Sequence, residues 1–230
     1  MATKGGPNII TDGLVLALDA ASPRSYPGTG TTWYDLSGKG YNATLFNTPT
    51  FADNTLQFRV ASSNYATCTF NEGLLKNTNE NGSWTIETSF KYISAPTVNE
   101  AVVVGRQGCH GGIYIYINNT LRHAIKTNSC WTGHSSVTAT TMIAGKEYHT
   151  TMVYNNGTTF TYLNGNFINS SLIDLTTYDF ANYSNTFWIG GISNFFTNID
   201  LSFIKCYNRA LSAAEITQNY NALKSRFELS

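Results

Sequence analysis

Two tight-turn signals, separated by a single short strand, constrain this chain more than any other feature of its sequence. Asn156-Gly157 and Asn164-Gly165 are residue pairs that accept positive φ angles in short hairpin turns. The segments that flank them, 148–154 and 158–163, are rich in the β-branched and aromatic residues that favour strands. Strands joined by such tight turns run antiparallel, so we predict consecutive β-hairpins in this region.

Similar short segments recur along the rest of the chain, several of them with alternating apolar and polar residues. We expect strands within 13–19, 55–60, 64–70, 83–92, 100–106, 111–119, 120–127, 186–192 and 199–208. The long segment between the first two is rich in Gly and Pro and is predicted to be a loop. About ten short strands separated by turn signals are typical of an all-β protein, so we predict an antiparallel two-sheet β-sandwich of the jelly-roll type.

One helical pattern lies near the C-terminus. Ser212 and Glu215 have the spacing of a capping box, in which each side chain bonds to the backbone N–H of the other residue. The apolar residues from Ile216 to Phe227 then follow at spacings of three and four, which places them on one helix face. We predict a short helix over about 212–227 that packs on the sandwich, and binding of a partner by this face is the alternative.

Length and charge limit the domain organisation and the function. The chain suits one large β domain, which we place at 11–230 after an N-terminal arm of residues 1–10. The 14 basic and 14 acidic residues form no clusters, which argues against nucleic-acid binding. No segment approaches the roughly 20 apolar residues of a membrane helix. The start lacks the apolar run of a signal peptide, so we expect synthesis in the cytoplasm and no membrane insertion.

Known catalytic patterns are not found. The strand that carries Glu87 has Ser89 where a second acid would lie in a glycoside hydrolase, and no G-x-S-x-G motif occurs. Gly-Lys-Gly at 38–40 lacks the spacing of a phosphate-binding loop. We therefore predict that this protein is not an enzyme.

Loop aromatics are candidates for glycan binding. Aromatic residues make up 13% of the chain, and most aromatic side chains of a sandwich fill its core. The four that are least easily explained as core residues, and which we take as candidate ligand-binding residues, are Trp33, Tyr34, Tyr41 and Trp131.

Cysteines suggest one cross-link. Cys109 and Cys130 flank a predicted strand pair, so a disulfide between them is geometrically plausible. Two free thiols fit a reducing compartment equally well. Cys68 and Cys206 lie within predicted strands and are expected to be small buried residues.

Taken together, these segments resemble the laminin-G-like, concanavalin A-like jelly-roll superfamily. The resemblance covers about residues 10–228 and rests on the segments 13–45, 83–92, 148–168, 187–191 and 199–227. Tyr148 stands where that family often has Trp. The opening segment GPNIITDGLVLALDAASPRSYPG is similar to stand-alone modules of tailed-bacteriophage structural proteins.

The resemblance implies a non-catalytic binding module. On this basis we expect a bacteriophage virion protein, either a capsid decoration protein or a surface component of the tail or fibre. It would be made in the host cytoplasm and present in many copies or as a homo-oligomer. Its partners would be other virion proteins and host surface glycans. The alternative is a soluble carbohydrate-binding lectin module that is assisted by calcium.

A calcium ion is also expected near Asp35, because proteins of this family often hold one structural calcium. Short turns rich in Asp, Ser and Asn offer the six to eight oxygen ligands that calcium takes. A plain glycine turn without an ion is the alternative. The predicted ligands are Asp35, the carbonyls of Ser37 and Tyr41, and Asn42, with Asp19 or Asp200 as further contributors.

Overall fold

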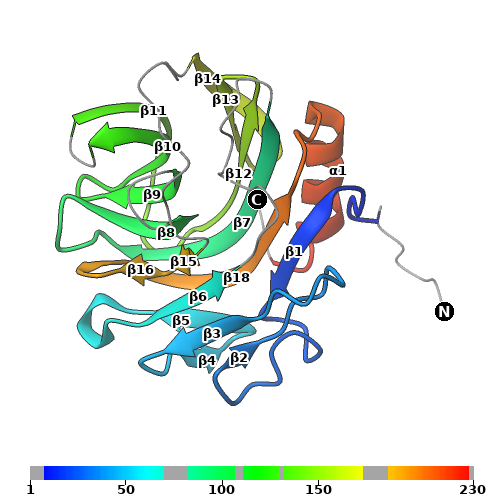
Figure 1. Ribbon diagram of the computed structural model, residues 1–230. Coiled ribbons are helices and arrows are strands. Elements are labelled where there is room, and N and C mark those ends of the chain that lie inside the picture. The colour runs from blue at the N-terminus through cyan, green and yellow to red at the C-terminus, as the bar shows by residue number, and fades with distance from the viewer. Residues whose placement is uncertain (1–7, 70–81, 107–110, 130–131, 173–185, 228–230) are drawn as a thin grey trace.

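The computed structural model is a sandwich of two antiparallel β-sheets with one α-helix against the outside of one sheet (Figure 1). It describes residues 8–69, 82–106, 111–129, 132–172 and 186–227. The predicted all-β sandwich with a C-terminal helix is thus confirmed. Within these ranges, no helix has the length and hydropathy that a membrane span requires.

The first sheet, called sheet I, has eight strands and carries the helix on its outer face. Its central strands β7 and β18 are long, and β1 pairs with β18 beside the main path. In spatial order the strands are β14 (Asn166–Leu172), β13 (Thr158–Leu163), β12 (Glu147–Asn155), β7 (Ser83–Ser94), β18 (Asn198–Tyr207), β5 (Thr55–Phe58) and β4 (Thr50–Ala52), with β1 (Leu14–Asp19) alongside.

The second sheet, called sheet II, also has eight strands. In spatial order they are β11 (Thr132–Thr141), β10 (Thr120–Ser129), β9 (Gly112–Tyr116), β8 (Glu100–Arg106), β15 (Thr186–Ile189), β6 (Tyr65–Thr69), β3 (Ala43–Phe46) and β2 (Thr32–Trp33). A small hairpin of β16 (Gly191–Ile192) and β17 (Phe195–Phe196) makes a separate pair. The sequence patterns did not predict β11 or the short strands β2, β3, β4 and β17.

The two predicted tight turns are present and join β12, β13 and β14. Asn156 and Gly157 have φ angles of 46° and 82°, and Asn164 and Gly165 have φ angles of 49° and 75°. Two consecutive positive φ values match the backbone twist of the flanking strands. The local chemistry of these residue pairs therefore sets the antiparallel order at this edge of sheet I.

Strand alternation separates the core from the outer face of sheet I. On β7, Ile86 and Phe90 lie fully buried between the sheets. Glu87, Ser89 and Lys91 alternate with them and therefore lie on the opposite face. The predicted burial of Cys68 and Cys206 is also confirmed, since both are free thiols inside the core. Along β7, sheet I thus has an apolar inner face and a polar outer face.

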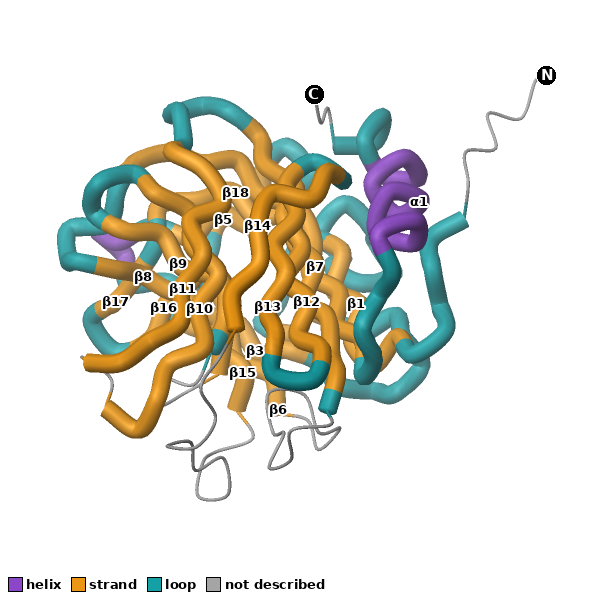
Figure 2. The backbone as a smooth tube through the Cα atoms, turned by 90° about the horizontal axis from the view of Figure 1, so that it is seen from above, coloured by secondary structure: helices purple, strands orange, loops and turns teal. Residues whose placement is uncertain are grey.

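The helix α1 (Ala213–Leu223) begins at the predicted capping box. The backbone N–H of Ser212 donates to the Glu215 carboxylate at 2.8 Å, and the Ser212 hydroxyl accepts from the Glu215 N–H. In Figure 2 the helix stands outside the strands, on the side of β1, β7 and β12. It buries Ile216 against residues of β12, β13 and β18, as the periodicity predicted.

The helix ends four residues earlier than predicted. After Leu223 the chain continues in a turn, in which the N–H groups of Arg226 and Phe227 both donate to the Leu223 carbonyl. Phe227 therefore lies in this turn, outside the regular helix. Its ring packs on Phe203 of β18, with ring centroids 5.1 Å apart. A tertiary aromatic contact thus joins the turn after the helix to β18.

Candidate functional site

The loop after β1 does not present its tryptophan to solvent. Trp33 is 0% exposed and lies in the core, so its prediction as a ligand-binding residue is wrong. The residue forms the short strand β2, paired with Ala43, and its side chain faces inward. Tyr41 is half-buried and packs against the core, whereas Tyr34 is 46% exposed. Trp131 and the predicted disulfide Cys109–Cys130 lie outside the described residues.

Asp35 is the centre of a hydrogen-bond cluster that holds this loop against β1. One carboxylate oxygen accepts from the backbone N–H groups of Ala17 at 2.8 Å and Ser37 at 2.9 Å. The other accepts from the Ser37 hydroxyl at 2.7 Å and the Tyr41 N–H at 3.1 Å. The Asn42 side-chain oxygen accepts from the Asp35 N–H. The residues predicted to bind calcium thus bind one another.

This donor set does not fit a calcium ion. Calcium needs oxygen atoms that are free to coordinate it, and four N–H or O–H donors already point at the Asp35 carboxylate. The two further predicted contributors are also engaged, since Asp19 binds Arg226 and Asp200 binds Arg59. Among the described residues, no group of three or more His, Cys, Asp or Glu side chains could hold a metal ion.

The glycines of the Gly-Lys-Gly segment serve the same turn. Gly38 and Gly40 have φ angles of 86° and 79°, in the left-handed region that L side chains rarely adopt. The segment therefore has a conformational explanation that needs no phosphate.

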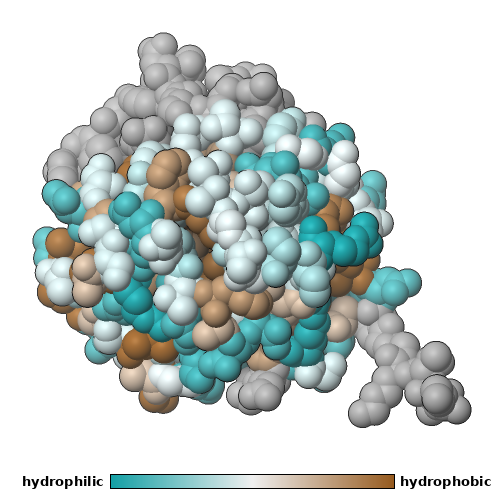
Figure 3. Space-filling model, turned by 90° about the horizontal axis from the view of Figure 1, so that it is seen from below, coloured by the Kyte–Doolittle hydropathy of each residue, from teal (hydrophilic) through white to brown (hydrophobic). Residues whose placement is uncertain are grey.

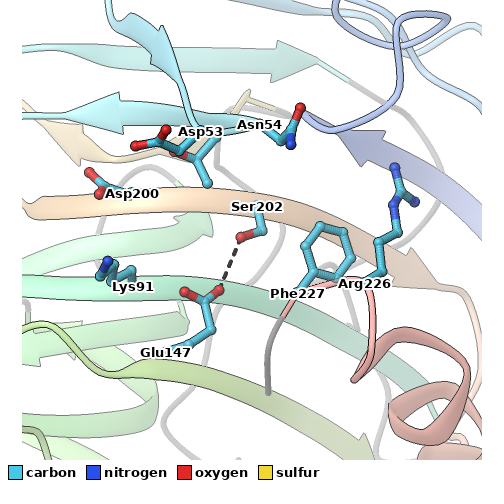
Figure 4. Close-up of a pocket in the computed structure, with 9 residues that line it drawn as sticks. Asp53, Asn54, Lys91, Glu147, Asp200, Ser202, Arg226 and Phe227 are labelled. Carbon is cyan, nitrogen blue, oxygen red and sulfur yellow. Dashed lines mark hydrogen bonds between the residues drawn. The ribbon is translucent and has the colours of Figure 1, made fainter.

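A polar pocket of about 460 Å³ opens on the outer face of sheet I beside the end of α1 (Figure 4). The floor of the pocket is formed by residues that the register of β12, β7 and β18 places side by side. Lys91 of β7 pairs with Glu147 of β12 on one side and with Asp200 of β18 on the other. Paired residues point to the same face of a sheet, so this lysine lies in a row between two carboxylates. Ser202 of β18 completes the floor.

Two segments far apart in the sequence form the walls. Asp53 and Asn54 make the tight turn between β4 and β5, with φ angles of 52° and 60° that their side chains tolerate. Opposite them, Arg226 and Phe227 approach from the turn that follows α1 (Figure 4). Carboxylate, amide, hydroxyl and guanidinium groups therefore face one space together with an aromatic ring.

The charges in the pocket nearly cancel. Asp200 and Arg226 are neutralised by the ion pairs described above. Asp53 and Lys91 carry opposite charges, which leaves Glu147 as the group whose protonation sets the net charge. A pocket of this kind suits a neutral, polyhydroxylated ligand better than a strongly charged one.

Glu147 is held by two hydroxyl groups. One of its carboxyl oxygens accepts from Ser89 at 2.9 Å and from Ser202 at 3.0 Å. Burial raises the pKa of Glu147 to about 7, and the Asp200 carboxylate adds to this rise. The two hydrogen bonds and the Lys91 ammonium group act in the opposite direction and lower the pKa. This carboxyl group therefore changes its charge near neutral pH.

We expect Glu147→Gln to remove a pH dependence of stability. The folded chain binds the Glu147 proton more tightly than the unfolded chain, whose Glu has a pKa near 4.5. This contribution to the free energy of unfolding is complete below that value and is lost as the pH rises to about 7. Urea unfolding at pH 5, 6, 7 and 8 should show the wild type losing stability relative to the variant.

Glu215→Gln is the matched control for this prediction. Hydrogen bonds from Arg209 lower the pKa of Glu215 to about 2, so its contribution is lost in acid rather than between pH 5 and 8. If Glu147→Gln and the wild type run parallel across this range, the neutral pKa of Glu147 is contradicted.

Sequence patterns could not reveal the pocket. Its residues come from five separate segments, namely 53–55, 91, 147, 200–202 and 226–227. No local motif links them, because the register of β12, β7 and β18 forms the row of the floor and tertiary packing brings the two walls to it. The signal that was present, alternation along β7 and β18, identifies outward-facing positions but not their neighbours.

A family model described as the concanavalin A-like lectin/glucanases superfamily matches residues 63–217. The chain belongs to this superfamily. Its membership confirms the resemblance inferred from the sequence. No curated protein matches the chain.

Solved structures share the concanavalin A-like fold at low sequence identity. Botulinum neurotoxin type C, whose cell uptake depends on interaction with two ganglioside molecules, is 19% identical with a TM-score of 0.70. The binding domain of botulinum neurotoxin DC in complex with rat synaptotagmin II is 17% identical with a TM-score of 0.71. In both cases the match covers 93% of this chain and 52% of the toxin chain.

A Trypanosoma rangeli sialidase in complex with the inhibitor DANA shows the same fold. It is 18% identical with a TM-score of 0.66, and the match covers 93% of this chain and 33% of the sialidase chain. The chain therefore spans only about half of the toxin chains and a third of the sialidase chain. These likenesses establish the fold.

Proposed function

We propose that this chain is a non-enzymatic glycan-binding module and that the pocket beside α1 is its binding site. Membership of a superfamily of lectins and glucanases supports the class of ligand. The observation that carries the proposal is the composition of the pocket, where polar groups and one aromatic ring converge on a single space. Its volume of about 460 Å³ falls within the range of small-molecule sites, roughly 300–1,000 Å³.

The side chains match the two faces of a sugar ring. Sugar hydroxyls donate to carboxylate oxygens and accept from ammonium and amide N–H groups, which Asp53, Lys91 and Asn54 provide. The apolar C–H face of a pyranose can lie against the ring of Phe227. A neutral hexose would satisfy both requirements without leaving a charge unpaired.

Hydrolysis of the bound sugar is disfavoured by the floor of the pocket. Glycoside hydrolases place two carboxyl groups on either side of the scissile bond. Here Lys91 lies between Glu147 and Asp200, and the Asp200 carboxylate is bound to Arg59 at 2.5 Å. In this row, the Asp200 carboxylate is ion-paired and the Glu147 carboxyl group is held by two hydroxyl groups, so we propose binding without turnover.

We expect an array of glycans terminating in glucose, galactose, mannose or N-acetylglucosamine to bind the wild-type chain. Asn54→Ala and Phe227→Ala should each weaken that binding at least tenfold, because a stacked ring or a polar partner that the ligand covers contributes about 1–3 kcal/mol. Binding constants from titration with the corresponding methyl glycosides provide the measurement, and circular dichroism confirms that the variants are folded.

Tyr34→Ala is the matched control, since Tyr34 is an exposed aromatic outside the pocket. It should leave affinity unchanged. If Tyr34→Ala abolishes binding while Phe227→Ala does not, the site lies in the loop after β1 and our assignment to the pocket is wrong. If no glycan binds, the proposed function itself is wrong.

We also propose that this module is a component of a bacteriophage virion, on the capsid or tail surface and in many copies. The similarity of its opening segment to phage structural modules supports this placement. In Figure 3 the hydrophobic residues of the visible face form small separate groups among hydrophilic and neutral ones, which suits a surface exposed to solution. Mass spectrometry of purified particles tests the proposal, and absence of the protein from them would contradict it.

A further inference from the structure

The aromatic wall of the pocket is held by a contact from the other end of the chain. Arg226 donates two hydrogen bonds to the Asp19 carboxylate, at 2.5 and 3.0 Å. A bidentate pair of this kind fixes orientation as well as position. Asp19 is itself oriented by the N–H of Ala21 at 3.0 Å. The end of β1 therefore determines where the turn after α1 lies.

Arg226 in turn restricts the position of the Phe227 ring. The Arg226 guanidinium carbon lies 5.0 Å from the centroid of the Phe227 ring, within the range of a cation–π contact. Phe203, which is 1% exposed and pairs with Asp19 in the strand register, also packs on this ring, with centroids 5.1 Å apart. The ring is thus positioned by a buried residue of β18 and by an arginine that is fixed from β1.

The ion pair is poorly placed to stabilise the fold. The Arg226 side chain is 40% exposed and the Asp19 side chain 17% exposed, and pairs near the surface contribute little to the free energy of unfolding. If the Phe227 side chain and its turn are already ordered, in contrast, a ligand that binds does not have to immobilise them. Less conformational entropy is then lost on binding. The geometry therefore favours a role in binding over a role in stability.

We infer that Asp19 and Arg226 are positioning residues that fix Phe227 as the stacking wall of the pocket. This inference rests on the proposed function, because the ligand that would contact the Phe227 ring is the proposed glycan. Neither residue needs to contact that ligand through its ion-paired atoms.

Hydrogen–deuterium exchange tests the positioning without any ligand. We expect Asp19→Asn to speed exchange of the amides of Arg226 and Phe227 at least tenfold relative to the amides of β7. The control is Asp12→Asn, which removes another exposed partner of an arginine, Arg209, away from the pocket. Exchange that is unchanged in Asp19→Asn, or equally faster in both variants, would overturn the inference.

Titration with the four methyl glycosides tests the consequence for binding. Asp19→Asn should weaken the affinity about three- to tenfold, as expected for one lost immobilised side chain. The charge-swapped double variant Asp19→Arg/Arg226→Asp should recover most of it, which a merely structural role would not predict. An affinity unaltered by Asp19→Asn contradicts the inference. If the wild type binds no glycoside, the proposed function fails, and the exchange experiment still decides whether the wall is positioned from β1.

Discussion

Replacing Glu87 by Gln is expected to lower the free energy of unfolding by about 3–5 kcal/mol, the usual cost of removing one partner of a buried charge pair. Glu87 is 1% exposed, beneath α1, where its carboxylate accepts from His149 at 2.7 Å and from Asn219 at 2.8 Å. Lys205 lies opposite it on β18. The variant would leave the Lys205 ammonium group buried without its nearest compensating charge.

The state of Lys205 explains the size of this effect. Its ammonium group is buried, has no hydrogen-bond partner among the described residues, and lies 3.8 Å from the centroid of the Phe203 ring. Burial lowers the pKa of Lys205, while the carboxylates of Glu87 and Asp19 oppose that change. Without Glu87, the chain must bury an unpaired cation or release its proton on folding, and both cost free energy.

Urea unfolding at pH 7 measures the change, and the double variant Glu87→Gln/Lys205→Met is the control. Because it removes both charges, it should recover most of the lost stability. For a domain of this size, a loss of about 4 kcal/mol corresponds to a decrease in melting temperature of roughly 8–16 °C. A single variant within 1 kcal/mol of the wild type would show that the pair is not coupled in this way.

The same pair gives a pH dependence of opposite sign to that of Glu147. Burial by itself would raise the pKa of Glu87, but the Lys205 ammonium group and the hydrogen bonds from His149 and Asn219 outweigh it and lower the pKa. This contribution to stability is therefore present above the pKa of the unfolded carboxyl group and is lost as the pH falls through the lower folded value. The difference between wild type and Glu87→Gln should shrink in acid.

Replacing Asp35 by Asn is expected to cost about 3 kcal/mol, or roughly 6–12 °C in melting temperature. The carboxylate accepts four hydrogen bonds that join the loop to β1. An amide keeps the shape but turns one acceptor into an N–H₂ group, which then faces two donors. Thermal unfolding followed by circular dichroism measures the loss. Ser37→Ala, which removes one donor to this carboxylate, should cost only about 1 kcal/mol.

Metal addition separates the two interpretations of this turn. If Asp35 is a hydrogen-bond centre, neither calcium nor EDTA should change the melting temperature of the wild type. If calcium instead raises it, and the rise disappears in Asp35→Asn, the predicted calcium site exists and the hydrogen-bond cluster describes only the metal-free turn.

Features with a local physical cause could be predicted from the sequence. The Asn-Gly pairs adopt their positive φ values because those residues tolerate them. The capping box of Ser212 and Glu215 forms because the two residues lie within one helical turn. Strand β8 was predicted with the bounds that the structure shows, since its apolar run is flanked by polar and Gly-rich segments. Each of these depends on residues close in the chain.

Features set by distant neighbours were missed or assigned wrongly. Trp33 lies in a Gly-rich segment that reads as an exposed loop, but its pairing with Ala43 turns the indole into the core. Phe227 continues the helical spacing, but the regular helix ends at Leu223 and the ring packs on Phe203 of β18. Neither partner is near enough in the sequence for a pattern to reveal the contact.

The amino-acid sequence by itself determined the all-β class, the hairpin turns and the start of the helix, because turn chemistry, alternation and capping act over a few residues. Its resemblance over longer segments indicated the superfamily. Only the tertiary structure decided what occupies the space beside α1. There, the register of three strands places Lys91 between Glu147 and Asp200, and an ion pair from β1 secures the opposite wall. Register and long-range ion pairs join residues that the chain keeps far apart, so the candidate site exists only in the folded molecule.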